Sequence, residues 1–458
     1  MRLAWFTPLA PVRSGISAYS REILPRLGRT HTIDVYLDRV VAITEETAAG
    51  GADTSVRIRS AFAFPFAHDA RPYDLIVYQL GNATCHDYMW PYLLRYPGLV
   101  VLHDGQLHHS RALCLLRAGR SPDYAAELRW SHPDAPAGAE AFATSGLTGT
   151  PYYLWPMVRP VLRRARALAA HAPWLVDELR RAAPETPVDL IRMGVAPVEA
   201  TRSRPDETVT VAAFGLVTPE KRIPQLLHAL AALRASAPPF RLRLVGDRAP
   251  HFDVDALVTA LGLDDVTAVT GFVDEDTLAE ELRAADICVC LRWPTSRESS
   301  ASWLRALAAG KATVVTDLVH TTEVAALDPR TWTVASAAPA VVAPDGALVD
   351  PRPIAVALDI LDEDHSLRLA LKRLLEDRAL REALGHEARD HWRREHTLER
   401  MAEDYERAIA TAAVAPSPGV PVDFPPHLLA DGTSLARAIA RDMGVALDLF
   451  DERPPSTR

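Results

Sequence analysis

The residues with the clearest chemical potential lie in segment 292–317, which reads RWPTSRESSASWLRALAAGKATVVTD. Within it, Glu298 stands in a Ser/Thr-rich turn between a predicted strand at 287–291 and a helix of small and apolar residues. Open α/β sheets bind ligands beyond the carboxyl ends of their strands, where helix N-termini offer free N–H groups to phosphates. With the backbone of Ser299 and Ser300, the turn could bind a sugar nucleotide. An ordinary strand–helix–strand unit with a polar turn is the alternative.

Two cations follow another predicted strand, at 208–214. Gly215 ends that strand, and Lys221 and Arg222 open the next helix. A cation there could reach a pyrophosphate on the helix N-terminus. The alternative is a pair of solvated cations, which the positive end of the helix dipole slightly disfavours.

Two further strand ends in this half carry glycine-containing turns. They are Gly246-Asp247, after the predicted strand 241–245, and Gly271-Phe272-Val273, after 266–269. The backbone of the second turn could contact a nucleobase edge. Each turn is a weak signal alone, but with the Glu298 turn they would surround one crevice.

Polar residues also follow predicted strands in the first half. Gly15 lies in the loop after strand 2–6, where a glycine lets backbone approach a ligand. A capping turn with Ser14 as the helix cap is equally consistent. A group of histidines and one carboxylate follows two later strands and comprises His86, His103, Asp104, His108 and His109. These groups could be catalytic or structural, and their spacing matches no strong metal-ligand pattern.

Composition and missing motifs exclude several classes of function. The 458 residues contain no early GxGxxG, Walker lysine motif, HExxH or paired CxxC, which disfavours NAD enzymes and P-loop kinases. The formal net charge of −9 argues against a general nucleic-acid binder. The four cysteines lack metal spacing, so we expect buried thiols in a reducing compartment.

The sequence also bears on membranes. Met1 leads directly into the predicted strand at 2–6, which leaves no room for a signal peptide. No apolar run approaches the roughly 20 residues that span a bilayer. We expect a cytoplasmic protein. The basic run RPVLRRAR at 159–166 could be a solvated helix face, which we favour, or a patch for peripheral contact with anionic lipid.

Short apolar strands alternate with helical patterns along most of the chain, which predicts an α/β protein with parallel sheets. A polar, Pro-rich stretch near 195–207 is a candidate boundary between two consecutive doubly wound domains. The predicted parts are a domain at 1–197, a domain at 208–385, helices at 386–413 that pack back across the domains, and a Pro-rich and helical tail at 414–458.

Three segments have less certain roles. Residues 121–153 are rich in Ala, Gly, Pro and Ser and read as an insertion, either a binding lid or a linker. Residues 354–361 are predicted as a helix. Residues 434–449 are predicted as an amphipathic helix that docks on the body or binds a partner, and docking is favoured.

These residues together resemble the large family-4 retaining glycosyltransferases of the GT-B fold, in which two Rossmann-like domains face each other across a cleft. The matching pieces in the second half are Phe214-Gly215 with Lys221, Gly246-Asp247, Gly271-Phe272-Val273, Ala285-Asp286 and the run from Glu298 to Gly310. The first half is similar to a bacterial branch of that family through Gly81-Asn82, His86, Pro97-Gly98, Leu102-His103-Asp104 and His108-His109. The resemblance covers roughly residues 1–410.

The resemblance implies transfer of a sugar from a nucleotide diphosphate donor to an acceptor hydroxyl, with retention at the anomeric carbon. Lys221 and Arg222 would stabilise the leaving phosphate, and Glu298 would hold sugar hydroxyls. His103, and less strongly Asp104, would contact the sugar from the acceptor side. The first domain would bind a carbohydrate, lipid-linked or small-molecule acceptor. No metal or other cofactor is expected, because the cations neutralise the diphosphate.

The sequence departs from the family pattern at two positions. Leu216 stands where many members have an arginine, and Arg305 stands where many have a second glutamate that holds the ribose. Arg305 could face the nucleotide instead. These departures keep three alternatives open: a non-catalytic GT-B partner, a nucleotide-binding regulator, and an epimerase or phosphorylase on the same scaffold. The sugar, the base and the acceptor are not encoded in a readable motif.

Overall fold

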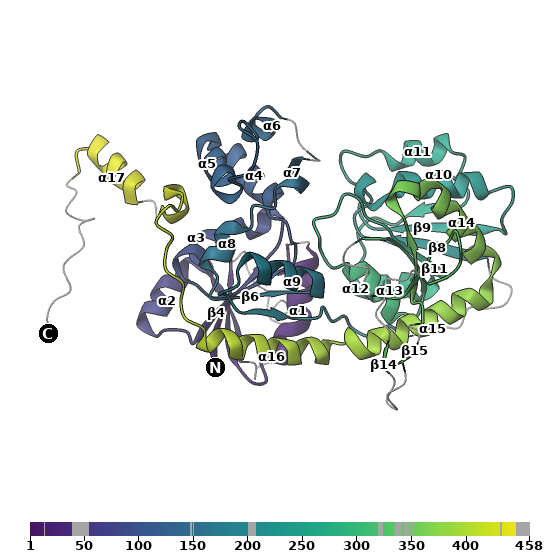
Figure 1. The fold of residues 1–458 in the computed structure, drawn as a ribbon, viewed down its shortest axis with the longest axis horizontal. Coiled ribbons are helices and arrows are strands. Elements are labelled where there is room, and N and C mark those ends of the chain that lie inside the picture. The colour runs from purple at the N-terminus through teal and green to yellow at the C-terminus, as the bar shows by residue number, and fades with distance from the viewer. Residues whose placement is uncertain are drawn as a thin grey trace.

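The chain forms two α/β bodies that lie side by side and are bridged by long helices at the carboxyl end (Figure 1). This computed structural model describes residues 1–12, 14–38, 55–146, 149, 151–199, 208–318, 324–334, 341–342, 348–349, 352–430 and 433–445. The candidate boundary near 195–207 falls partly outside these ranges, at 200–207.

The N-terminal body is built on a parallel sheet of seven strands in the order β3-β2-β1-β4-β5-β6-β7. Most of its central strands are buried along their whole length, as expected for a sheet covered by helices on both faces. The chain reverses its direction of travel across the sheet between β1 and β4. The strands are β1 (Arg2–Phe6), β2 (Thr32–Leu37), β3 (Val56–Ser60), β4 (Leu75–Leu80), β5 (Leu99–Leu102), β6 (Ala167–Ala170) and β7 (Val188–Leu190).

The described helices of this body include three, α5 to α7, in the segment that the sequence presented as an insertion. The segment is therefore helical rather than a loose linker, and Tyr124, Leu128 and Tyr152 help to form its own small apolar core. Its alanines favour helix, which explains the difference. The helices are α1 (Gly15–Leu27), α2 (Phe64–Ala70), α3 (Trp90–Arg95), α4 (His108–Arg117), α5 (Ser121–Ser131), α6 (Glu140–Thr144), α7 (Pro151–Leu154), α8 (Arg159–Arg164) and α9 (Pro173–Ala182).

The C-terminal body repeats the doubly wound plan with seven parallel strands in the order β10-β9-β8-β11-β12-β16-β13. Its reversal point lies between β8 and β11. The strands are β8 (Val209–Phe214), β9 (Phe240–Val245), β10 (Thr267–Val269), β11 (Ile287–Cys290), β12 (Ala312–Thr316), β13 (Ala326–Leu327) and β16 (Ala355–Leu358), with a separate antiparallel pair β14 (Val341–Val342) and β15 (Leu348–Val349). The helices are α10 (Ile223–Leu233), α11 (Val254–Ala260), α12 (Glu275–Ala284), α13 (Ala301–Ala308) and α14 (Glu363–Glu376).

One sequence prediction in this body is wrong. Residues 354–361 were expected to form a helix, but β16 (Ala355–Leu358) is a strand that pairs with β12 and β13. Val356 and Leu358 are fully buried. A short apolar run enclosed on both faces lacks the periodicity that separates a strand from a helix, so only its sheet neighbours identify it.

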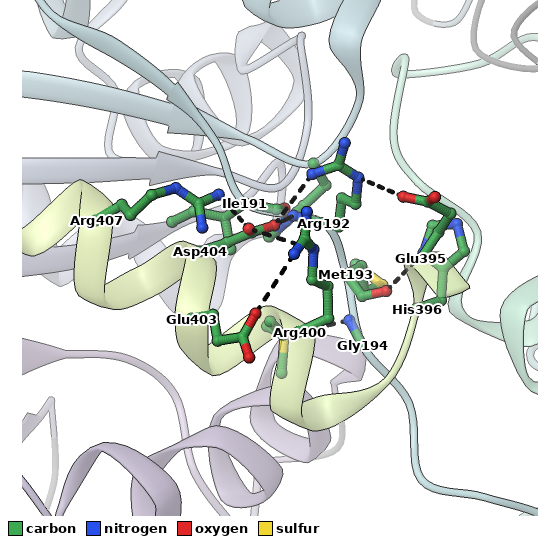
Figure 2. A network of polar contacts seen from close by, with 12 residues as sticks. Ile191, Arg192, Met193, Gly194, Glu395, His396, Arg400, Glu403, Asp404 and Arg407 are labelled. Carbon is green, nitrogen blue, oxygen red and sulfur yellow. Dashed lines mark hydrogen bonds and ion pairs between the residues drawn. The ribbon is translucent and has the colours of Figure 1, made fainter. Parts of the chain in front are cut away.

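Two long helices join the bodies: α15 (Arg378–Glu395) packs on the C-terminal sheet, and α16 (Leu398–Val414) packs on α1 of the N-terminal body (Figure 1). Figure 2 shows how their corner is fastened to the segment that follows β7. The fully buried Asp404 accepts a hydrogen bond from the backbone N–H of Arg192 at 2.9 Å, and the Arg192 guanidinium lies 2.9 Å from Glu395. Gly194 is so close that an added Cβ would lie 2.4 Å from the Thr397 carbonyl.

The chain after α16 forms a strap at 415–429 that lies on the N-terminal body. Two arginines of the basic run at 159–166 fasten it: Arg164 donates to the Pro418 carbonyl at 2.7 Å, and Arg166 donates to the last turn of α16 at 2.7 Å. Arg164 is only 4% exposed. The favoured interpretation of this run as a solvated face is therefore wrong for these two residues, since the chain itself uses their donors.

The predicted tail helix is shorter than expected. Helix α17 (Thr433–Asp442) projects from the outer side of the N-terminal body, while residues 446–449 of the prediction lie outside the described residues (Figure 1). Among the helices that the structure describes, none is long and apolar enough to cross a lipid bilayer.

Candidate active site

Two small adjoining pockets lie at the reversal point of the C-terminal sheet, beyond the carboxyl ends of β8 and β11. They share Cys290, Arg292 and Ser300 in their walls. Glu298 lines the first and Lys221 lines the second. This is the place where doubly wound sheets bind ligands.

Lys221 reaches the pocket because two glycines make room for it. Its ammonium donates a hydrogen bond to the carbonyl of Phe214, at the end of β8. Gly215 has φ of 92°, and an added Cβ there would lie 2.2 Å from the Lys221 Nζ. Gly246 has φ of 154°, and its added Cβ would lie 2.1 Å from the Gly215 carbonyl oxygen. Burial, with the nearby charge of Arg292, lowers the pKa of Lys221 to about 7.

Glu298 is held in the turn between β11 and α13. Its carboxylate forms an ion pair with the Arg292 guanidinium and accepts a hydrogen bond from the Thr295 hydroxyl at 2.9 Å. Ser300 caps α13 by accepting from the Trp303 N–H at 3.3 Å, and Ser299 is the residue between Glu298 and this cap. A carboxylate, a guanidinium and a helix N-terminus therefore converge on one pocket.

Arg292 is the residue of this group that sequence reasoning missed. It stands two residues beyond the end of β11, and its guanidinium forms part of both pockets. The signal was its position, because a long cation just after a strand end near the reversal point is well placed to face a ligand. It supplies positive charge to both pockets, whereas Leu216, where the family pattern has an arginine, lines neither and is 47% exposed.

Asp104 faces this group from the N-terminal body. One of its carboxylate oxygens accepts a hydrogen bond from the Asn82 backbone N–H at 2.6 Å. Burial and, to a smaller extent, the negative charge of Glu298 together raise the pKa of Asp104 to about 7. Sequence reasoning paired His103 and Asp104, and the fold brings the carboxylate of this pair to the Glu298 turn.

His103 points into the N-terminal body instead. Its Nε2 lies 2.8 Å from the Gln79 amide oxygen and its Nδ1 lies 3.2 Å from His171 Nε2. The ring packs edge-on against Tyr19. Burial, with the nearby His171, holds the pKa of His103 well below its usual range. With both ring nitrogens hydrogen-bonded in this way, the imidazole has no nitrogen left to contact a sugar.

The other histidines of the predicted group are also engaged within the body. His86 Nδ1 donates to the Gln79 carbonyl at 3.0 Å, and His108 Nε2 lies 2.7 Å from the Tyr124 hydroxyl. Burial lowers the pKa of each to about 4. His109 packs on the ring of Tyr152. Within the residues that the structure describes, no group of three or more His, Cys, Asp and Glu side chains is placed to hold a metal ion.

Two of the predicted nucleotide-binding cations lie elsewhere. The Arg222 guanidinium is bound by Glu363 at 2.8 and 2.9 Å, and Arg222 has φ of 59°. Arg305 is bound by Glu275 at 2.8 Å and by Glu22 of the N-terminal body at 3.7 Å. Neither arginine lines the two pockets. Each pairs with an acid that only folding brings near.

The remaining predicted residues do not line either pocket. Asp247 accepts from the Phe272 N–H at 2.8 Å, and Phe272 is 57% exposed at the turn after β10. Val273 packs against the apolar core. Gly15 begins α1 with nothing within 4 Å of an added Cβ, while Ser14 accepts from Ser17 N–H at 3.1 Å as the helix cap. The capping alternative therefore accounts for the Gly15 loop.

Comparisons with known proteins agree with this geometry. Residues 208–352 match a family described as glycosyl transferases group 1. The chain is similar to sucrose-phosphate synthase from Thermosynechococcus elongatus, at 16% identity over 91% of this chain and 100% of that chain, with a TM-score of 0.60. It is also similar to Anabaena HepE in complex with UDP and glucose, at 14% identity over 90% of this chain and 100% of that one, with a TM-score of 0.59. A third similar structure is WaaG, a glycosyltransferase involved in lipopolysaccharide biosynthesis, at 14% identity over 89% and 99%, with a TM-score of 0.56. None of the curated proteins compared with the chain matches it.

The two facing parallel sheets are therefore those of the GT-B fold. The match to the glycosyl transferases group 1 family covers residues 208–352 of this fold, in the C-terminal body.

Proposed function

We propose that the chain is a retaining glycosyltransferase that moves a sugar from a nucleotide diphosphate sugar to an acceptor hydroxyl. The observation that carries this proposal is the convergence of Lys221, Arg292 and Glu298 on adjoining pockets at the reversal point of the C-terminal sheet. Two cations and a carboxylate match the two ends of such a donor, since the diphosphate is anionic and the sugar presents hydroxyls.

The diphosphate would lie against Lys221 and Arg292. As the bond to the sugar breaks, negative charge grows on the leaving phosphate, and fixed cations stabilise that charge in a site with little water. Arg292 is always charged, while the low pKa of Lys221 makes its charge sensitive to its surroundings. A bound diphosphate favours the protonated form of Lys221. In this proposal the two cations take the place of a metal ion.

The sugar would lie between Glu298 and Asp104. Glu298 accepts hydrogen bonds from sugar hydroxyls and shares the Arg292 guanidinium with the phosphate. The N–H groups at the start of α13, next to Ser299 and Ser300, add donors for the anionic part. Asp104 and Asn82 form the opposite wall, on the domain that we propose binds the acceptor. A raised pKa suits Asp104 to hold a proton near the acceptor hydroxyl.

UDP-glucose is the first donor to test, because the structurally similar HepE binds UDP and glucose. The acceptor class remains the broader one of carbohydrate, glycolipid or small molecule. The experiment incubates the full-length chain with UDP-, GDP-, dTDP- and ADP-sugars and measures release of the nucleoside diphosphate.

Transfer to a panel of acceptors follows, with the anomeric configuration of the product read by NMR. Lys221→Met provides the control, since it keeps an unbranched side chain of nearly the same length and removes its charge. Release that is equal in wild type and Lys221→Met would contradict the proposed site. A product with inverted configuration would contradict the retaining mechanism alone.

A further inference from the structure

The turn that carries Glu298 is tied to the N-terminal domain through Arg297. The Arg297 Nη1 lies 2.7 and 2.9 Å from the two carboxylate oxygens of Glu178, on α9. The guanidinium also lies 6.0 Å from the ring of Trp174 on the same helix. This contact joins the two domains.

Arg297 adopts a backbone conformation that an arginine rarely takes. Its φ of 63° lies in the left-handed region, which glycine enters freely and residues with a Cβ do not. Such strain persists only where surrounding contacts enforce it. Here the ion pair with Glu178 holds the side chain, which connects the strained residue of this turn to the other domain.

A short chain of hydrogen bonds leads from this strained residue to Glu298. The Arg297 backbone N–H donates to the Thr295 Oγ1 at 2.9 Å, and the Thr295 hydroxyl donates to the Glu298 Oε2 at 2.9 Å. The backbone position of Arg297 therefore orients the hydroxyl that orients the carboxylate.

Other contacts show that the N-terminal domain is seated against this turn. The Asn82 side-chain amide donates to the Ser296 hydroxyl at 3.4 Å. An added Cβ on Gly105 would lie 3.2 Å from the Arg297 Cβ, so the turn after β5 packs directly on Arg297. All residues of the Glu298 turn belong to the C-terminal domain, but the turn also packs against residues of the N-terminal domain.

We propose that Glu178 is a positioning residue for sugar transfer, which acts through Arg297 and Thr295 to hold Glu298 in its working orientation when the two domains meet. This inference rests on the proposed function of Glu298. When the domains separate, Arg297 loses Glu178 and its turn is free to relax, which releases the Thr295 hydroxyl from its position. The donor site is then complete only while the acceptor domain is in place, and donor hydrolysis in the open state is limited.

The test compares Glu178→Ala with Asp177→Asn. Asp177 is the preceding residue on α9 and pairs only weakly, with Arg180 at 3.5 Å. We expect Glu178→Ala to lower kcat for transfer roughly three- to tenfold, with the KM for donor changed by less than about twofold, because positioning affects the transition state more than binding. The melting temperature of Glu178→Ala should stay close to that of Asp177→Asn, whose kcat should match wild type.

A second variant separates the relay from simple loss of an ion pair. Arg297→Gly accepts the left-handed conformation without strain, so it keeps the turn while removing the side chain. We expect Glu178→Ala to add no further loss of kcat in an Arg297→Gly background. A kcat for Glu178→Ala equal to wild type, or equal additional losses in both backgrounds, would overturn the proposal.

Small-angle X-ray scattering of the free protein distinguishes failure of this inference from failure of the proposed function. The Glu178→Ala variant should show a larger radius of gyration than Asp177→Asn, because the domains separate more often. A wild type that transfers no sugar would refute the proposed function and with it the catalytic role of Glu178, even if the scattering differs. An active wild type, with scattering and kcat unchanged in Glu178→Ala, refutes only the inference.

Discussion

Two arginines compete for the role of second phosphate cation, and replacing each by glutamine separates them. Arg222 was expected to bind the diphosphate from its place beside Lys221, but in the structure it pairs with Glu363, while Arg292 lines both pockets. Arg292→Gln and Arg222→Gln each remove one positive charge from the C-terminal body. Their effects should nevertheless differ in kind.

Arg292→Gln should act on catalysis. Removing one preorganised donor to a developing anion typically lowers kcat by about 10²–10³-fold. The Arg292 side chain is 32% exposed and Lys221 remains, so we expect the lower end, roughly 10²-fold or about 2.7 kcal/mol of transition-state stabilisation. Arg292→Lys should recover part of this loss, since it restores the charge but not the forked geometry.

Arg222→Gln should act on stability. Glu363 is only 6% exposed, and the substitution leaves this carboxylate buried without its cation. An unpaired buried acceptor costs about 1–3 kcal/mol, and more when it is charged. At about 2–4 °C per kcal/mol for domains of this size, the melting temperature should fall by roughly 2–12 °C or more. The change in kcat should stay below about threefold, because the guanidinium contributes nothing to the pocket.

The assay measures kcat and KM for donor hydrolysis and transfer, with the melting temperature of each variant recorded in the same buffer. Thermal unfolding of a two-domain chain need not be two-state, so the comparison uses the shift between matched variants. The reasoning is refuted if Arg222→Gln loses as much kcat as Arg292→Gln while its melting temperature is unchanged. That result would indicate that Arg222, rather than Arg292, is the second cation that binds the phosphate.

Three more outcomes follow from the described contacts. Because the pKa of Lys221 is lowered to about 7, its ammonium is charged below that pH and loses its proton above it. The affinity for UDP, measured by calorimetry, should therefore fall between pH 6 and 9, and Lys221→Arg should flatten this pH profile. An equally steep fall in Lys221→Arg would refute this prediction. Gly215→Ala should lower stability and activity more than Gly119→Ala does. Both glycines have positive φ, but only an alanine at position 215 places a Cβ 2.2 Å from Lys221 Nζ. Equal effects of the two substitutions in denaturant unfolding and donor hydrolysis would contradict the steric argument. Arg164→Ala should make the strap at 415–429 sensitive to limited proteolysis, because Arg164 donates a hydrogen bond to it. Arg163 is exposed, and Arg163→Ala should leave the strap protected. Cleavage of the strap at the same rate in both variants would show that Arg164 does not fasten it.

The parts of the site that sequence patterns identified are those that depend on local geometry. Lys221 and the Glu298 turn each lie between a strand end and the start of a helix, and this local order places them at the ligand-binding edge of a parallel sheet whatever the rest of the fold does. The alternation of strands and helices was likewise enough to predict two doubly wound domains, because each unit is recognisable within about 30 residues of sequence.

The sequence by itself therefore determined which turns could contact a ligand. Only the tertiary structure decided which side chains in and around these turns are available to bind it. Arg222 pairs with Glu363, which lies 141 positions away along the chain. Arg305 pairs with Glu275 and, at a longer distance, with Glu22, which lies 283 positions away. The His103 ring is turned into a buried network, and 355–358 becomes a strand between β12 and β13. A long side chain pairs with whatever opposite charge or acceptor the fold brings within reach, and that neighbour is set by packing between distant segments rather than by the residues beside it.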